Sequence, residues 1–163
     1  NPEYHYKCDV FDAIQDKEWD IAIFHPPCTY LCNSGVSHLH KDTNRWIEMI
    51  RASKFFSKLL NCGVPKVCVE NPIMHKYAKE IIGEGQAQVV QPWMFGHTEK
   101  KATCLWLRNL QPLKETINVR KETESLPKKD QQRIHHLPPS KDRWKLRSIT
   151  YAGIAEAMAE QWG

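Results

Sequence analysis

Two apolar stretches of the sequence each run into residues that could carry out covalent chemistry. Ile21–Phe24 is followed by His25-Pro26-Pro27-Cys28, and Val67–Val69 is followed by Glu70-Asn71-Pro72. Cysteine is a strong nucleophile once ionised, and two preceding prolines give a rigid turn that would aim the thiol. A nearby glutamate that is protonated can act as a general acid. Cys28 and Glu70 therefore suit attack on an electron-poor ring, with the thiolate adding at C6 of a pyrimidine and the acid protonating N3.

The surrounding pattern alternates between strands and helices, which predicts an α/β domain with a mainly parallel sheet. Because the carboxyl ends of parallel strands meet at one edge of a sheet, we expect Cys28 and Glu70 to emerge there together. The expected strands are 5–10, 19–24, 66–70, 87–91 and 102–107, and the expected helices are 43–61, 74–82 and 151–162. Residues 111–147 show no sustained period and contain four prolines, so we expect them to be rich in loops.

HPPC after one apolar strand and VENP after the next resemble motifs of the DNA cytosine-5 methyltransferases. The chain is most similar to the small phage and prophage type, over nearly its whole length. The resemblance implies a Rossmann-like methyltransferase sheet flanked by helices. It implies methyl transfer from S-adenosylmethionine to C5 of a cytosine flipped out of DNA. Its catalytic residues would be Cys28 as nucleophile, Glu70 as the acid at N3, and Asn71 as the residue that holds the catalytic loop.

The resemblance also implies a set of cofactor-binding residues. Asp9, within CDVFD, corresponds to the acidic residue near the adenine, and Pro26 and Pro27 belong to the same site. Gly153 lies in SITYAGIAEAMAEQWG, which resembles the last motif of the family, a turn and helix that closes against the cofactor. The family's opening glycine-containing turn and the acidic residue for the ribose have no counterpart. We therefore expect an N-terminally truncated sheet, whether by fragmentation or by nature, with an apolar edge that invites homo-oligomerisation.

The excess positive charge lies in one late segment. Residues 111–147 contain ten Lys and Arg against five Asp and Glu. Such a segment can attract nucleic acid, although a solvated, charge-mixed loop gives the same pattern. We assign 1–110 and 148–163 to the catalytic core and 111–147 to a small target-recognition segment, which predicts weak or short sequence specificity. The candidate DNA contacts are Lys100, Lys101, Thr103, Arg143, Trp144 and Lys145; the first three follow QPWMFGH, which recurs in the small phage group.

Length and composition narrow the class of protein. A chain of 163 residues with 41 % hydrophobic and 26 % charged residues suits one globular domain and not a disordered chain, a collagen or a membrane bundle. Six unclustered cysteines, with no basic-then-apolar leader pattern, indicate a reducing cytoplasm. Only Cys28 and Cys32 have zinc-ligand spacing, and we expect no metal.

Three other functions remain open. A proline-rich loop similar to HPPC serves amino-methyltransferases acting on adenine N6 or cytosine N4, although His25 and Cys28 depart from that motif. The missing cofactor half favours a non-catalytic nucleic-acid-binding remnant. Action on a free cytosine nucleotide is disfavoured by the basic segment.

Overall fold

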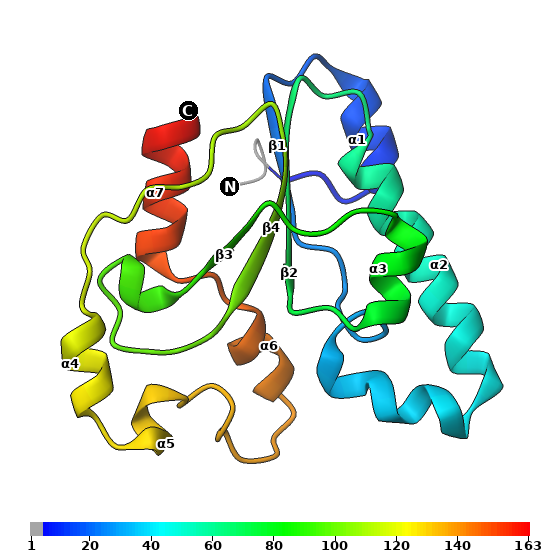
Figure 1. Cartoon of the computed structure of the whole chain (residues 1–163). Coiled ribbons are helices and arrows are strands. Elements are labelled where there is room, and N and C mark those ends of the chain that lie inside the picture. The colour runs from blue at the N-terminus through cyan, green and yellow to red at the C-terminus, as the bar shows by residue number, and fades with distance from the viewer. Residues whose placement is uncertain (1–4) are drawn as a thin grey trace. The chain divides into compact units, whose positions relative to one another are not determined.

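The computed structural model describes residues 5–163 and shows an α/β protein with a mixed four-stranded sheet (Figure 1). The strand order is β1-β2-β4-β3, with β1 at Ile21–Phe24, β2 at Lys66–Pro72, β3 at Gln88–Val90 and β4 at Thr103–Arg108. The predicted α/β class is confirmed, and the sheet is mixed, with β1 and β2 parallel. The chain divides into two compact units. The first comprises the described residues up to Ala87 with Leu105–Leu110, and the second comprises Gln88–Cys104 with Gln111–Gly163.

The first unit is built on the parallel pair β1 and β2. Their register places Ile21 beside Lys66 and Phe24 beside Val69. Both strands are short and apolar, as expected for segments that pack against helices. Val67, Cys68 and Val69 are buried in the core. The predicted strands over 19–24 and 66–70 are thus confirmed, and they are parallel neighbours.

Helices of the first unit lie together on one side of the β1–β2 pair (Figure 1). They are α1 (Val10–Asp16), η2 (Asn33–Lys41), α2 (Thr43–Leu60) and α3 (Lys76–Ile82). The predicted helix over 43–61 is confirmed by α2, which begins where the Asp42 side chain accepts from Asn44 N at 2.9 Å. Its buried face includes Phe56, whose ring meets Trp106 edge-on with centroids 4.9 Å apart.

The predicted strand over 5–10 is wrong, because helix α1 begins at Val10. The Asp9 carboxylate accepts a hydrogen bond from Phe11 N at 2.8 Å, so Asp9 is the N-cap of this helix. A capping bond satisfies a backbone donor that would otherwise lack a partner at the helix start. The ring of Phe11 then packs edge-on against Phe55 of α2, with centroids 5.9 Å apart. Helix capping and this packing outweigh the short run of β-forming residues.

The second unit contains short helices around a small core. They are η3 (Pro92–Met94), α4 (Arg120–Ser125), α5 (Lys128–Gln131), α6 (Arg143–Ser148) and α7 (Ala152–Trp162). Residues 111–147 lie wholly in this unit and, as predicted, are mostly loop, with three short helices. The predicted C-terminal helix is confirmed by α7, which buries Ile154, Met158 and Trp162. Within residues 5–163, no helix is long and apolar enough to cross a membrane.

Candidate active site

The register of β1 and β2 sets the geometry just beyond the strand ends. Phe24 lies beside Val69, and the next two residues of each segment also meet. His25 Nδ1 lies 2.9 Å from Glu70 Oε2, and Asn71 Nδ2 donates to the Pro26 carbonyl at 3.0 Å. Residues that are 45 positions apart in sequence are thus brought together at the carboxyl edge of two parallel strands. This is the edge where α/β proteins gather functional groups.

The His25–Glu70 pair joins a half-exposed imidazole to a mostly buried carboxyl group. The side chain of His25 is 46 % exposed and that of Glu70 is 20 % exposed. The contact therefore links a carboxyl group that is mostly shielded from water to a side chain that reaches water. Sequence reasoning considered His25 only as a departure from another methyltransferase motif. The missed signal was the position of His25 directly after β1. Glu70 holds the equivalent position in β2, one residue after the apolar run Val67–Val69.

Asn71 is the buried member of the site. It is 1 % exposed, and its donation to the Pro26 carbonyl ties β2 to the turn that precedes Cys28. Asn71 Oδ1 is buried and has no hydrogen-bond partner among residues 5–163. The role of Asn71 in holding a catalytic loop stays a prediction.

Cys28 begins a single helical turn. Its carbonyl oxygen accepts from both Leu31 N and Cys32 N at 3.0 Å. Residues four apart lie on the same side of such a turn, so the side chains of Cys28 and Cys32 share one side of it. Both cysteines are half-buried, and Cys32 Sγ also lies 3.1 Å from Ser34 Oγ. The sequence did not assign any role to Cys32 in this chemistry.

A second segment, residues 73–75, also holds this turn. Asn33 N donates to the Ile73 carbonyl at 2.9 Å, and His75 N donates to the Leu31 carbonyl at 3.1 Å. The His75 ring is buried and bridges two elements. Its Nδ1 accepts from Ala78 N at the start of α3, which leaves Nε2–H to donate to the Tyr30 carbonyl at 2.9 Å. The loop that carries Cys28 is therefore a fixed structure held by both strand ends.

The two thiols of this turn differ in their affinity for a proton. The pKa of Cys32 is lowered to about 5, because the Cys28 thiol, the Ser34 hydroxyl and nearby backbone N–H groups donate to its sulfur. The pKa of Cys28 is raised well above its ordinary value. The causes are its hydrogen bond to Cys32, its burial, and the negative charges of Cys32 and Glu70. The two shifts run in opposite directions, so Cys32 loses its proton more readily than Cys28 does.

Another cysteine lies close to the site but is inert. Cys68 is fully buried within β2, and burial together with the charge of Glu70 raises its pKa to about 12. A thiol of this kind stays protonated and behaves as a small apolar side chain. Cys28 and Cys32, which are half-buried, are the accessible thiols just beyond these two strands.

The four residues expected to bind the cofactor are dispersed. Asp9 is exposed and caps α1, while the Pro26 carbonyl is engaged by Asn71 and Pro27 is exposed. Gly153 lies in the other unit, near the start of α7, where a Cβ atom would collide with the Phe95 carbonyl. Each of Asp9, Pro26 and Gly153 thus has a structural role of its own.

Among the expected DNA contacts, two belong to the interior of the second unit. The Lys101 ammonium donates to the carbonyls of Arg147 and Ile149, at 2.8 and 3.4 Å, and so secures the end of α6. Thr103 is 6 % exposed, and its hydroxyl donates to the Lys101 carbonyl at 3.2 Å. Lys100 is half-buried, and its backbone N–H donates to the Gln131 carbonyl.

Helix α6 carries the other three expected contacts, and two of them face water. Trp144 is 72 % exposed, and Lys145 is exposed beside it. Arg143 is half-buried and donates to the His135 carbonyl at 3.3 Å. An indole this exposed is unusual. With cationic neighbours, it suits stacking on a base next to a phosphate.

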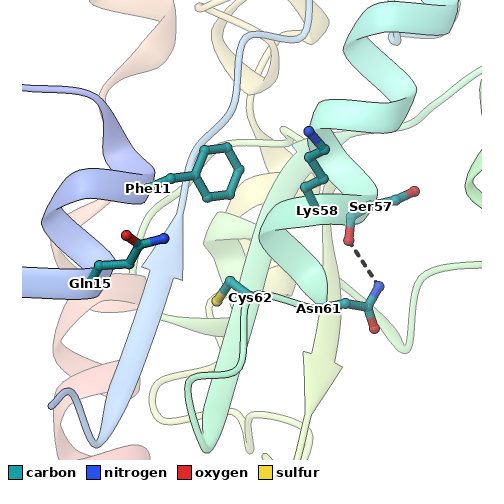
Figure 2. Close-up of a pocket in the computed structure, with 6 residues that line it drawn as sticks. All are labelled: Phe11, Gln15, Ser57, Lys58, Asn61 and Cys62. Atoms are coloured by element: carbon teal, nitrogen blue, oxygen red, sulfur yellow. Dashed lines mark hydrogen bonds between the residues drawn. The ribbon is translucent and has the colours of Figure 1, made fainter.

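A surface pocket of about 480 Å³ lies between α1 and the end of α2, and Figure 2 shows its lining. The lining residues are Phe11, Gln15, Ser57, Lys58, Asn61 and Cys62. A neighbouring pocket of about 550 Å³ shares Gln15 and Cys62. Asn61 and Cys62 come before β2, whereas Glu70 comes near its end, so these pockets lie toward the amino end of β2. They are distinct from the site around Cys28.

Metal ligands do not cluster in the described part of the chain, since residues 5–163 contain no group of three His, Cys, Asp or Glu placed to hold an ion. Comparison with known proteins found no protein-family model and no curated protein that matches this chain. Function must therefore be argued from the site itself.

Proposed function

We propose that this chain is the catalytic core of a DNA cytosine-5 methyltransferase with a Rossmann-like sheet. One observation carries the proposal. Cys28 and Glu70 come at the ends of two neighbouring parallel strands, close enough for the charge of Glu70 to raise the pKa of the Cys28 thiol. A nucleophile and an acid at one sheet edge are the two groups needed to activate C5 of a pyrimidine.

The proposed activation of cytosine is a reversible addition. The Cys28 thiolate forms a bond to C6, and the electron pair of the C5–C6 double bond moves to form a C4–C5 double bond. The electron pair of the C4–N3 double bond takes the proton that Glu70 donates to N3. C5 is now the nucleophilic end of an enamine. Once C5 has taken an electrophile, loss of its proton restores the C5–C6 double bond and expels the thiolate.

Glu70 must hold a proton at the moment of addition, and His25 supports this requirement. The imidazole contacts the carboxyl oxygen at 2.9 Å and is half-exposed, so it connects the buried carboxyl group to water. A protonated Glu70 also carries no charge against the Cys28 thiolate. In the proposed cycle, the proton on Glu70 therefore has two effects. It is available for donation to N3, and it removes a negative charge that would oppose the Cys28 thiolate.

S-adenosylmethionine is the methyl donor that the resemblance implies, and it would supply an electrophilic methyl group to C5. The described residues do not fit a cofactor pocket. Asp9 caps a helix, the Pro26 carbonyl is engaged, and the Gly153 backbone is packed against Phe95. The chemistry that we assign to this chain's own residues is therefore the activation of C5.

DNA is the proposed partner, with helix α6 as its contact. Exposed Trp144 and Lys145 supply stacking and phosphate attraction, and Arg147 adds charge on the same helix. A reducing cytoplasm is the compartment that suits this chemistry, because all six cysteines are free. Pairing of the edge strand β1 with a second copy, where Ile23 is 37 % exposed, stays a prediction that light scattering at several concentrations would test.

The decisive experiment measures exchange of the cytosine C5 hydrogen with solvent. Protein is mixed with duplex DNA containing cytosine labelled with tritium at C5, without any methyl donor, and tritium release is followed. We expect release by the natural chain and none by Cys28→Ser or Glu70→Gln, with Cys62→Ser as the matched thiol control. A covalent adduct with 5-fluorocytosine DNA and S-adenosylmethionine, mapped to Cys28, would extend the result to methyl transfer.

Other outcomes would select other functions. Tight DNA binding without tritium release would indicate a non-catalytic nucleic-acid-binding remnant. Methyl transfer that survives Cys28→Ser would indicate an amino-methyltransferase. Tritium release from free cytidine monophosphate but not from DNA would move the substrate to the nucleotide.

A further inference from the structure

A surface of the first unit combines aromatic rings with cationic side chains. Its residues come from the turn that begins at Cys28, from η2, and from the starts of α2 and α3. They are Tyr30, His40, Arg45, Trp46, Lys76 and Tyr77, and we refer to them as the Arg45 surface. None of the six is buried. Aromatic rings interleaved with cations are typical of surfaces that bind nucleic acid.

Arg45 carries a charge that no carboxylate of the described residues neutralises. Its guanidinium carbon lies 5.0 Å from the centre of the Tyr30 ring, and its Nε is buried without a hydrogen-bond partner in residues 5–163. The neighbouring acidic groups are engaged elsewhere, since Asp42 caps the start of α2 and Glu48 pairs with Arg51. A cation in the first turn of a helix also opposes the helix dipole. Helix stability therefore does not explain Arg45, whereas an anionic partner does.

His40 presents an exposed ring whose orientation is fixed. It meets Trp46 edge-on with centroids 5.8 Å apart, and it meets Tyr77 edge-on at 6.0 Å. Trp46 and Tyr77 pack against each other at 4.9 Å and so join α2 to α3, which gives these two rings a structural role. His40 lies at the exposed border of this cluster. A ring that is already held in place loses little conformational entropy when a base stacks on it.

The charge of the surrounding sequence favours a polyanion. Residues 25–41 contain no Asp or Glu, and Lys41 is exposed next to His40. On α3, Lys76 Nζ lies 4.9 Å from the centre of the Tyr77 ring, and Lys76 forms no ion pair within the described part of the chain. The Arg45 surface therefore suits a chain of phosphates that also offers aromatic groups.

We propose that the Arg45 surface binds a single strand of DNA, with Arg45 at a backbone phosphate and a base stacked on the His40 ring. Stacking on a side chain requires a base that is not already stacked in a duplex. The identity of the strand rests on the proposed function: Tyr30 follows Cys28 by two residues in the same turn, so the strand is the one around the extruded cytosine. Binding itself does not depend on that assignment. The surface is separate from the α6 contact, which belongs to the second unit.

Binding of fluorescein-labelled oligodeoxythymidine tests the proposal without any cytosine. Fluorescence anisotropy is measured over a range of salt concentrations, with a thymidine–adenosine duplex of the same length for comparison. We expect the natural chain to prefer the single strand. Arg45→Gln should weaken binding and lower the slope of log affinity against log salt by about 0.7, the value for one phosphate contact on a single strand. His40→Ala should weaken binding about fivefold or more through the loss of a stacked base.

Matched variants make the result specific. Arg51→Gln removes the same charge from a later turn of α2, where the guanidinium is exposed and paired with Glu48, and should leave the salt slope nearly unchanged. Arg45→Lys keeps the charge and should retain the slope. His40→Ala changes an exposed side chain and does not threaten the fold.

Three results would overturn the proposal. They are a preference for the duplex or no binding at all, equal effects of Arg45→Gln and Arg51→Gln, and normal binding by His40→Ala. If tritium release from cytosine DNA fails while the expected pattern holds, the cytosine assignment is wrong and the Arg45 surface stands. If tritium is released while Arg45→Gln and His40→Ala bind normally, the surface is wrong and the proposed function stands.

Discussion

His25 Nδ1 lies 2.9 Å from Glu70 Oε2, in the position that the parallel register of β1 and β2 dictates one step beyond Phe24 and Val69. The contact joins a carboxyl group that is mostly shielded from water to an imidazole that is not. In the proposed reaction, this contact gives the Glu70 carboxyl group a path for protons to and from water.

Replacing His25 should slow the activation of cytosine without abolishing it. For His25→Gln, we expect tritium release at pH 7.5 to fall about 10²-fold, within the range of a lost proton-transfer group. The loss should shrink as the pH falls, because hydronium ions then compete with His25 as the source of the proton. His38→Gln, an exposed histidine of η2, is the control. An equal loss at every pH would mean that His25 only holds the loop in place.

Asn71→Ala should destabilise the first unit. It removes the buried bond to the Pro26 carbonyl, and a buried acceptor left without its donor costs about 1–3 kcal/mol. Urea denaturation would measure this loss. Asn61→Ala removes a similar amide–carbonyl bond, to Ser57, at an exposed site and should cost less. Equal costs for the two variants would contradict a special role for Asn71.

The thiol pair should make stability depend on pH. The pKa of Cys32 is lowered on folding, so its contribution is present above the ordinary thiol pKa and is lost as pH falls toward about 5. The raised pKa of Cys28 acts in the opposite direction, and its cost appears only as pH rises above about 8.5. The free energy of unfolding of the natural chain, relative to Cys32→Ala, should therefore grow between pH 5 and 8. A flat difference across that window would contradict the lowered pKa of Cys32.

Gly153→Ala should destabilise the second unit whether or not a cofactor binds. The added methyl group would meet the Phe95 carbonyl and the His97 ring, and Gly153 N already donates to His97 Nε2 at 3.0 Å. Overpacking of this kind costs about 1–3 kcal/mol. Gly85→Ala is the control, since nothing lies within 4 Å of the new atom there. A stable Gly153→Ala protein that has lost only affinity for S-adenosylmethionine would restore the cofactor role.

Trp144→Ala should weaken DNA binding by the loss of one stacked base, about 1–3 kcal/mol or roughly 5- to 150-fold in affinity. Lys145→Ala should weaken it less and lower the slope of binding against salt by about one. Lys54→Ala, on an exposed part of α2, is the matched charge control. Fluorescence anisotropy over a range of salt concentrations would measure all three. Equal losses of DNA affinity in Lys54→Ala and Lys145→Ala would indicate electrostatic attraction that is not specific to α6.

Sequence patterns predicted those helices and strands whose formation depends mainly on the order of neighbouring residues. The apolar spacing over 43–61 and the stops at Gly63 and Pro65 predicted α2 to within a residue, and the apolar run at 66–70 predicted β2. The failure at 5–10 has a local cause as well. Asp9 could be a turn former or a helix cap, and only its bond to Phe11 N decides between them.

The sequence by itself also placed a thiol and a carboxyl group after two apolar strands, which was enough to predict that they share a sheet edge. Tertiary structure alone decided their partners. Glu70 meets His25 and Asn71 meets Pro26 across 45 residues, because the register of two parallel strands fixes which residues face each other. The turn that carries Cys28 and Cys32 is likewise held by residues 73–75, which follow the second strand. Such contacts follow from the packing of distant segments, and no local pattern encodes that packing.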